Sequence, residues 1–83
     1  MKQFKIDNEL ISKIKKLIGD NNRDKLLSSL ADIHYADLAE IFELLDTTEV
    51  IFLVKIFDKQ KIADALAEID EDLREIILEK LSA

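Results

Sequence analysis

The chain has 83 residues with no proline, one glycine and no cysteine, so we expect one small domain without disulfide bonds or thiolate metal sites. Apolar residues make up 48% of the sequence and charged residues 36%, which excludes a disordered chain, and the scarcity of turn residues excludes an all-β fold. The longest apolar run, residues 50–54, is far shorter than the roughly twenty residues of a membrane span. No secretory signal is evident, so we expect a cytosolic location.

The charge is distributed unevenly along the chain. Residues 1–25 hold seven basic and four acidic side chains, whereas residues 26–83 hold five basic and fourteen acidic ones, and the net charge is −6. Nucleic acid is a poor partner for such a chain because phosphate contacts need a basic surface. A cation or a basic protein surface matches the acidic part better, although excess acid also serves simply to keep a small domain soluble.

Two helices are predicted before residue 34. The first runs from Asp7 to Ile18, and we expect Gly19 at the C′ position, where a left-handed backbone ends many helices. The second lies near residues 22–32, because apolar residues recur there at helical spacing. These apolar residues are Leu26, Leu27, Leu30 and Ile33.

A twelve-residue repeat occupies the rest of the chain. Its apolar members are Ile33, Leu45, Phe57, Ile69 and Leu81, and each of the first four is followed at once by a possible helix N-cap. The caps are His34, Asp46, Asp58 and Asp70. Asp is a strong N-cap because its carboxylate accepts hydrogen bonds from the free amides of the first turn. The repeat therefore predicts four amphipathic helices.

The repeat is better described as a pair of helices. Residues 36–40 match residues 60–64, with a small Ala followed by an acid, whereas the intervening helices have a large apolar residue in place of the acid. Such alternation is typical of a stack with an inner and an outer layer. We expect Ala39 and Ala63 to allow close helix contact. The pattern predicts an all-α fold, a right-handed solenoid or superhelix of about six short helices in tandem helical-hairpin repeats, in a single domain over residues 1–83.

The last predicted helix, residues 72–81, carries a wide apolar surface with no following helix to cover it. The surface comprises Ile76, Ile77, Leu78 and Leu81. Terminal repeats normally have a polar outer face. Either this surface packs back on the preceding helices, or the natural domain continues, or the surface binds another copy. We expect a domain truncated at its C-terminal side, and self-association of the isolated chain.

Three segments of the chain resemble the N-terminal cytosolic domain of MgtE-type magnesium transporters and channels. They read His-Tyr-Ala-Asp-Leu-Ala-Glu at residues 34–40, Lys-Ile-Ala-Asp-Ala-Leu at 61–66 and Ile-Asp-Glu-Asp-Leu-Arg at 69–74. The resemblance covers about residues 24–81. Tyr35 departs from the family pattern, which has Pro at this position. The flagellar rotor protein FliG is built from similar short helices, so the first segment carries most of the resemblance.

The resemblance implies regulation by magnesium. In such transporters this domain lies on the cytoplasmic side of a homodimeric membrane protein and docks on the CBS domains when Mg²⁺ bridges acidic residues of both surfaces, which favours the closed pore. Hard divalent cations prefer such oxygen ligands. The family's acidic ligand matches Asp64, one methylene shorter, so the resemblance implies Asp64 as a metal ligand. Glu40 is its repeat equivalent, and Asp37 and Glu68 lie nearby in sequence.

Other functions have less support in the sequence. His34 is the single histidine and stands where the other repeats have an Asp cap, so we interpret it as a cap and not as a metal ligand. We expect no enzyme, because the chain has no Gly-rich phosphate loop, nucleophile elbow or Cys/His pair. The alternative function is a helical-repeat protein–protein adaptor, FliG-like or stand-alone, without metal sensing. In that case Asp37, Glu40 and Glu68 are ordinary exposed carboxylates.

Overall fold

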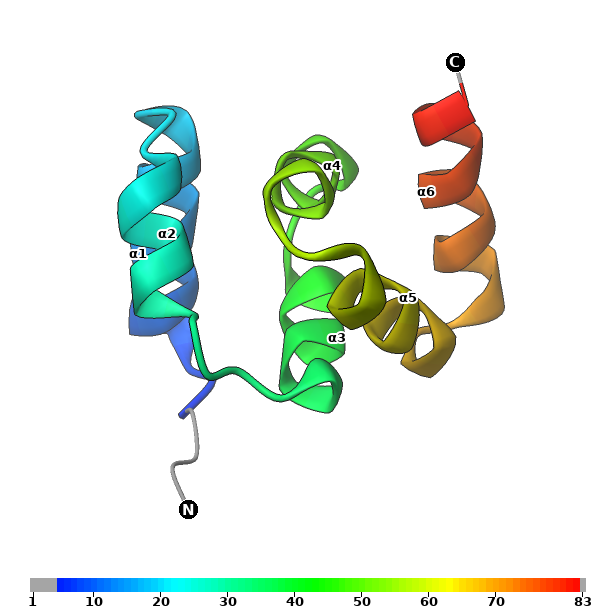
Figure 1. Ribbon diagram of the computed structural model, residues 1–83, viewed down its shortest axis with the longest axis horizontal. Coiled ribbons are helices and arrows are strands. Elements are labelled where there is room, and N and C mark those ends of the chain that lie inside the picture. Colours follow the sequence, from blue (N-terminus) through cyan, green and yellow to red (C-terminus); the bar gives the residue numbers. More distant parts are fainter. Residues whose placement is uncertain (1–4, 83) are drawn as a thin grey trace.

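The computed structural model of the protein describes residues 5–82. Within this range all regular structure is helical, with six α-helices and no strand, as the sequence predicts (Figure 1). The second helix is shorter than the predicted one near residues 22–32, because Leu30 already has a non-helical backbone. The helices are α1 (Asn8–Gly19), α2 (Arg23–Ser29), α3 (Tyr35–Leu44), α4 (Thr47–Ile56), α5 (Lys59–Glu68) and α6 (Glu71–Ser82).

The four predicted N-caps of the repeat begin α3 to α6. Nδ1 of His34 accepts a hydrogen bond from the backbone N–H two residues on at 3.0 Å, and Oδ2 of Asp70 accepts one from the equivalent N–H at 3.1 Å. Oδ2 of Asp58 accepts from the N–H three residues on at 3.0 Å. At the start of α4 the side chain of Glu49, three residues into the helix, accepts a hydrogen bond from the backbone N–H of the cap residue Asp46 at 2.9 Å. These bonds satisfy amides that a helix leaves free at its start.

Helix α1 ends in a Schellman turn that uses asparagine where glycine was predicted. The N–H of Asn21 donates to the C=O of Ile18, and the N–H of Asn22 donates to the C=O of Leu17, both at 2.9 Å. Asn21 has a φ of 56°, in the left-handed region, whereas Gly19 has no positive φ and is the last helical residue. The prediction of Gly19 at C′ is therefore wrong. Asn replaces Gly at such positions because its short polar side chain tolerates a left-handed backbone.

Alternate helices pack against each other in two rows. The most extensive contact joins α3 with α5; α4 with α6 and α1 with α2 follow equally, and α1 also touches α4. Figure 1 shows α1 and α2 at one end of the molecule and α6 at the other. The contacts of α3 with α5 and of α4 with α6 agree with the two layers that the paired repeat predicts, and the right-handed solenoid stays a prediction.

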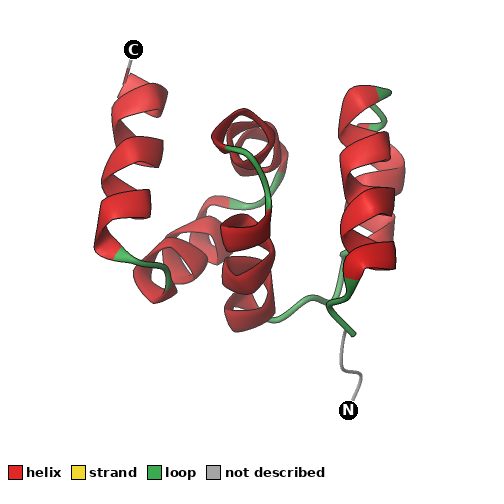
Figure 2. Ribbon diagram, turned by 180° about the vertical axis from the view of Figure 1, so that it is seen from behind, coloured by secondary structure: helices red, strands yellow, loops and turns green. Residues whose placement is uncertain are grey.

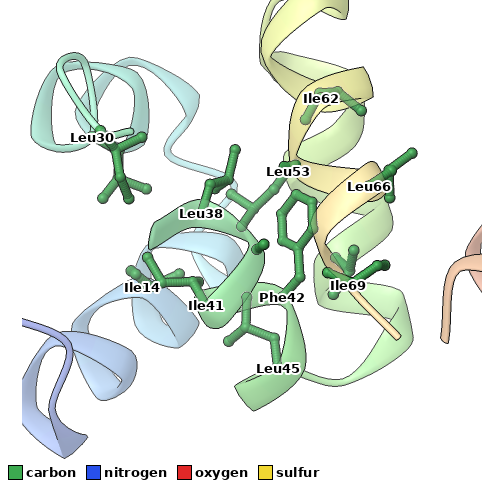
Figure 3. Close-up of a cluster of buried hydrophobic side chains, with 14 of the residues drawn as sticks. Ile14, Leu30, Leu38, Ile41, Phe42, Leu45, Leu53, Ile62, Leu66 and Ile69 are labelled. Atoms are coloured by element: carbon green, nitrogen blue, oxygen red, sulfur yellow. The ribbon is translucent and has the colours of Figure 1, made fainter. Parts of the chain in front are cut away.

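The core is made of apolar side chains from all six helices. No polar or charged side chain is buried among the described residues. Figure 3 shows the central part, where Leu53 of α4 lies next to Phe42 of α3, and Leu66 of α5 is on the other side of Phe42 in this view. The twelve-residue series follows this core, since Ile33, Leu45 and Ile69 are buried and Phe57 is half-buried, and only its last member is exposed.

Two details of the predicted packing are wrong. Ala39 is buried as expected, but its repeat equivalent Ala63 is exposed, because α5 has α3 on one side and no described helix follows it in its row. In α6, Ile77 is fully buried instead of belonging to the uncovered surface. The remaining members of that surface are exposed as predicted, and they are Ile76, Leu78 and Leu81.

An ion pair ties the N-terminal helices to the repeat. Nζ of Lys15 in α1 lies 2.9 Å from Oε1 of Glu49 in α4, and this is the one salt bridge formed within residues 5–82. The hydrogen bond to Glu49 raises the pKa of Lys15 above its ordinary value, against a smaller opposing effect of desolvation. Desolvation acts to raise the pKa of Glu49, but hydrogen bonds from Lys15 and the Asp46 N–H, with the lysine charge, outweigh it and hold that pKa below its ordinary value.

Replacing Leu66 by Ala tests the packing of α5 against α3. The side chain is 9% exposed, so its truncation should lower the free energy of unfolding by roughly 2 to 5 kcal/mol through lost burial and a residual cavity. Leu44→Ala is the matched control, because Leu44 is 52% exposed and its truncation should cost less than about 0.5 kcal/mol. Urea denaturation followed by circular dichroism measures both, and equal losses would contradict the packing.

Substitutions at Gly19 and Asn21 should have opposite effects on stability. A Cβ at Gly19 would meet no atom within 4 Å, and the backbone there is helical, so Gly19→Ala should stabilise the protein by roughly 0.5 to 1 kcal/mol. Asn21→Ala should cost roughly 1 kcal/mol because alanine disfavours the left-handed backbone. Thermal unfolding of both variants measures these changes in stability. Destabilisation by Gly19→Ala would contradict the helical backbone at Gly19 and would favour its predicted C′ position.

The Lys15–Glu49 pair should make stability depend on pH. Because the pKa of Glu49 is lowered in the folded state, its contribution is present above the ordinary value of 4.5 and is lost as the pH falls through the folded pKa. Because the pKa of Lys15 is raised, its contribution is present below 10.5 and is lost only as the pH rises through its folded pKa. A double-mutant cycle of Lys15→Met and Glu49→Gln should show favourable coupling at pH 7 and none well below the carboxylate range. Coupling that is the same at both pH values would exclude an ionic contact.

Candidate functional site

Asp64 and Glu40, the residues predicted to bind metal, occupy equivalent positions on neighbouring helices. Asp64 is the sixth residue of α5 and Glu40 the sixth of α3, and these two helices pack side by side (Figure 1). Glu40 is exposed and Asp64 is half-buried. The repeat makes the two positions equivalent along their helices, and we call the acidic residues around them, Asp37, Glu40, Asp64 and Glu68, the acidic side.

The two helices surround these carboxylates with different neighbours. On a helix, residues three or four apart share a face. Glu40 therefore has Asp37 beside it, whereas Asp64 has Glu68 on one side and Lys61 on the other. The lysine replaces the acid of the preceding repeat and reduces the negative charge around Asp64. The α3 part of the acidic side is thus the more negative of the two.

A hydrogen bond orients the carboxylate of Asp64. Nε2 of Gln60, one turn earlier in α5, donates to its Oδ1 at 3.2 Å. No other side-chain partner of this carboxylate is found in the part of the chain that the structure describes, and Oδ2 is open to solvent. A side chain held in this way loses less rotational freedom when it binds a cation.

The acidic side offers donors that suit magnesium but does not assemble a metal site. Carboxylate oxygens are hard ligands of the kind that Mg²⁺ prefers, and they leave room for its retained water. Within residues 5–82, however, no three His, Cys, Asp or Glu side chains come together closely enough to hold a metal ion. Asp64, Glu40, Asp37 and Glu68 are therefore not brought together as a single set of ligands.

His34 has a structural role. Its Nδ1 accepts from the N–H of Ala36 at the start of α3, as the cap interpretation predicts, and its ring lies 4.2 Å from that of Tyr35, centroid to centroid. Tyr35 is 37% exposed and opens the first turn in place of the family's Pro. The pair covers a helix start and supplies no group to the acidic side.

Sequence reasoning missed the second role of Glu49. Its place three residues after Asp46 indicates a capping box, but its pairing with Lys15, 34 residues away, has no signal in the sequence. Only the packing of α1 against α4 brings the two side chains together. The described helices form no pocket, and none of them is long and apolar enough to cross a membrane.

Comparison with protein families gives a match that agrees with this geometry. A family model described as the MgtE intracellular N domain matches residues 33–83, which contain α3 to α6 and the acidic side. The match begins nine residues after the start of the resemblance seen in the sequence, which covered about residues 24–81. Helices α1 and α2 precede the match. Neither the curated proteins nor the solved structures contain a match to the chain. Since the family model covers more than half of the sequence, the chain belongs to the MgtE intracellular N domain family.

Proposed function

We propose that this chain is the Mg²⁺-sensing regulatory domain of a magnesium transporter. On the cytoplasmic side of the membrane, in a homodimeric parent protein, it docks on the CBS domains of the same transporter and thereby gates the pore. Membership of the MgtE intracellular N domain family supports the regulatory role. The observation that carries the metal-sensing role is the repetition of a carboxylate at one position of two packed helices, Glu40 in α3 and Asp64 in α5.

The mechanism follows from charge. Two carboxylates about 4 Å apart at a protein surface repel by about 4 kcal/mol, so two acidic surfaces stay apart at low Mg²⁺. Mg²⁺ held by Asp64 and Glu40 together with acids of the facing surface would supply the positive charge that lets the two surfaces meet. Binding of the cation then shifts the equilibrium towards the docked, closed state by as much as its affinity for that state exceeds its affinity for the other.

Asp64 is the better placed of the two proposed ligands. Gln60 donates a hydrogen bond to one oxygen of Asp64, and the half-buried position of Asp64 already restricts its rotamers. Less side-chain entropy is therefore lost when Asp64 binds a cation. Lys61 on the same face opposes cation binding, so a tight site would need further carboxylates from the facing surface. We therefore expect weak binding to the isolated chain, in the millimolar range of sparse carboxylate sites.

Substitution of Asp64 in the full-length transporter tests the proposal. Asp64→Ala removes one ligand of the closed state, so the cytosolic Mg²⁺ concentration that halves transport should rise by about fivefold, the equivalent of about 1 kcal/mol of lost binding. Asp64→Glu should restore most of the inhibition. Asp32→Ala, an exposed acid outside the acidic side, is the matched control and should leave the inhibition curve unchanged.

Two results would count against the proposal. Coincident inhibition curves for Asp64→Ala and the parent, at equal expression, would make Asp64 an ordinary surface carboxylate. Binding of this domain to the CBS domains with the same affinity with and without Mg²⁺ would make it a helical-repeat adaptor without metal sensing. Pull-down of the separated CBS domains in buffers with Mg²⁺ or EDTA distinguishes the second case.

A further inference from the structure

The cap of α3 differs in its chemistry from the caps of the helices that follow. Helices α4, α5 and α6 begin at aspartates, whereas α3 begins at the imidazole of His34. Nδ1 of His34 accepts a hydrogen bond from the N–H of Ala36 at 3.0 Å, and both residues are exposed. A ring nitrogen accepts only while it carries no proton, so the proton of the capping ring lies on Nε2. The cap of α3 therefore requires a neutral imidazole.

Protonation of His34 removes this cap. An imidazolium ring has an N–H at both nitrogens, so Nδ1 would meet the Ala36 N–H donor to donor instead of accepting from it. The positive ring would also lie at the positive end of the α3 dipole, which opposes a cation. Histidine changes its charge between about pH 5 and 8, whereas aspartate carboxylates stay ionised over that range. Acidification to about pH 5 thus affects the cap of α3 and leaves the aspartate caps in place.

The ionisable neighbours of His34 along the chain act on the folded and the unfolded protein alike. They are Asp32, Tyr35 and Asp37, and the Tyr35 ring lies 4.2 Å from the imidazole, centroid to centroid. Carboxylates and an aromatic ring attract a protonated imidazole. Because all three are within three residues of His34, they stay near the ring when the protein unfolds. The hydrogen bond from the Ala36 N–H, in contrast, belongs to the folded helix alone.

Charged groups on other elements form no ion pair with His34. The one salt bridge within residues 5–82 joins α1 to α4. Helix α5 packs against α3, and its ionisable side chains, with that of its cap, are Asp58, Lys59, Lys61, Asp64 and Glu68. The Asp58 carboxylate accepts from backbone amides of its own helix, and the two lysines oppose a further positive charge. The two remaining acids lie more than one turn beyond the start of α5, so none of these groups replaces the lost cap.

The cap lies where the N-terminal helices join the rest of the protein. Residues 30–34 connect α2 to α3 and form a longer connection than residues 45–46, 57–58 and 69–70. Figure 2 shows this loop leading from α2 into the start of α3. Leu30 and Ile33 anchor the loop in the core, and His34 follows them at its exposed end. Release of the cap therefore acts where the chain enters the segment that matches the family model.

We infer that His34 makes the start of α3 a pH-sensitive joint. With a neutral ring, the first turn of α3 is capped and the loop from α2 is fixed to it. With a protonated ring, the cap is released, the first turn loosens and the folded state is less stable. Because the folded protein then binds this proton less readily than the unfolded chain, stability falls as the pH drops through the imidazole range. The inference involves neither Asp64 nor Glu40 and is independent of the proposed magnesium sensing.

Stability measured against pH tests the inference with a reference that does not titrate. His34→Asn keeps a neutral acceptor at the cap and has no side chain that changes its charge between about pH 5 and 8. Urea denaturation followed by circular dichroism gives the unfolding equilibrium constant of the parent and of the variant. The ratio of the parent's constant to that of the variant should rise by about fivefold from about pH 8 to pH 5, the effect of losing one cap. Other groups titrate equally in both proteins and cancel from the ratio.

His34→Asp is the matched control, because it gives α3 the cap residue of the later helices. The ratio of its unfolding constant to that of His34→Asn should change by less than about twofold over the same pH range. Nitrogen-15 NMR gives a second readout, since His34 is the single histidine and its ring signals are unambiguous. The neutral ring should carry its proton on Nε2, and the Ala36 amide signal should change with the same midpoint as the ring.

Each contrary result overturns the inference. A ratio of parent to His34→Asn that stays constant or falls on acidification would exclude His34 as the group that responds to pH. An equal rise for His34→Asp would assign the pH dependence to other groups. A neutral ring with its proton on Nδ1 would exclude the hydrogen bond on which the joint depends.

Discussion

Burial of apolar side chains between alternate helices is the interaction on which the whole structure depends. The helices are 7 to 12 residues long, and isolated helices of this length are marginal in water. Each one persists because another helix covers it: α5 packs on α3, α6 on α4, and α1 on α2 and α4. Phe42 and Leu53, both fully buried, lie where these contacts converge. Loss of such a residue therefore affects several helices at once and not only the one that carries it.

This dependence on neighbours gives the two ends of the molecule different properties. At one end α1 and α2 close the stack, fastened to α4 by the Lys15–Glu49 pair, and the basic residues are concentrated there. At the other end α6 has no successor among the described helices, and Leu78 and Leu81 remain exposed. Val54 and Phe57, the residues 24 positions earlier, are half-buried against the core, so the two members of each pair differ in exposure.

The repeat also arranges the charges that the proposed function needs. Because α3 and α5 pack together, residues that recur every 24 positions occupy equivalent places along two neighbouring helices. Glu40 and Asp64 recur in this way, but their neighbours do not, since Lys61 stands where α3 has Asp37. In the proposed function, these carboxylates share a cation with a facing surface.

The sequence by itself determined the all-helical fold, the helix starts and the core, because caps and apolar residues at fixed spacing are local signals. His34, Asp46, Asp58 and Asp70 begin helices as predicted, and Ile33, Leu45 and Ile69 are buried as the repeat requires. The candidate ligands Asp64 and Glu40 were also placed correctly on α5 and α3, since the spacing alone makes them equivalent. Only the tertiary structure decided features that depend on which elements become neighbours. These features are the left-handed backbone at Asn21 instead of Gly19 and the ion pair of Lys15 with Glu49. They also include the exposure of Ala63 but not of Ala39, and the burial of Ile77 between two exposed residues. Helical spacing identifies which side of a helix is apolar, but burial requires a second surface, and the chain order does not say where that surface will be.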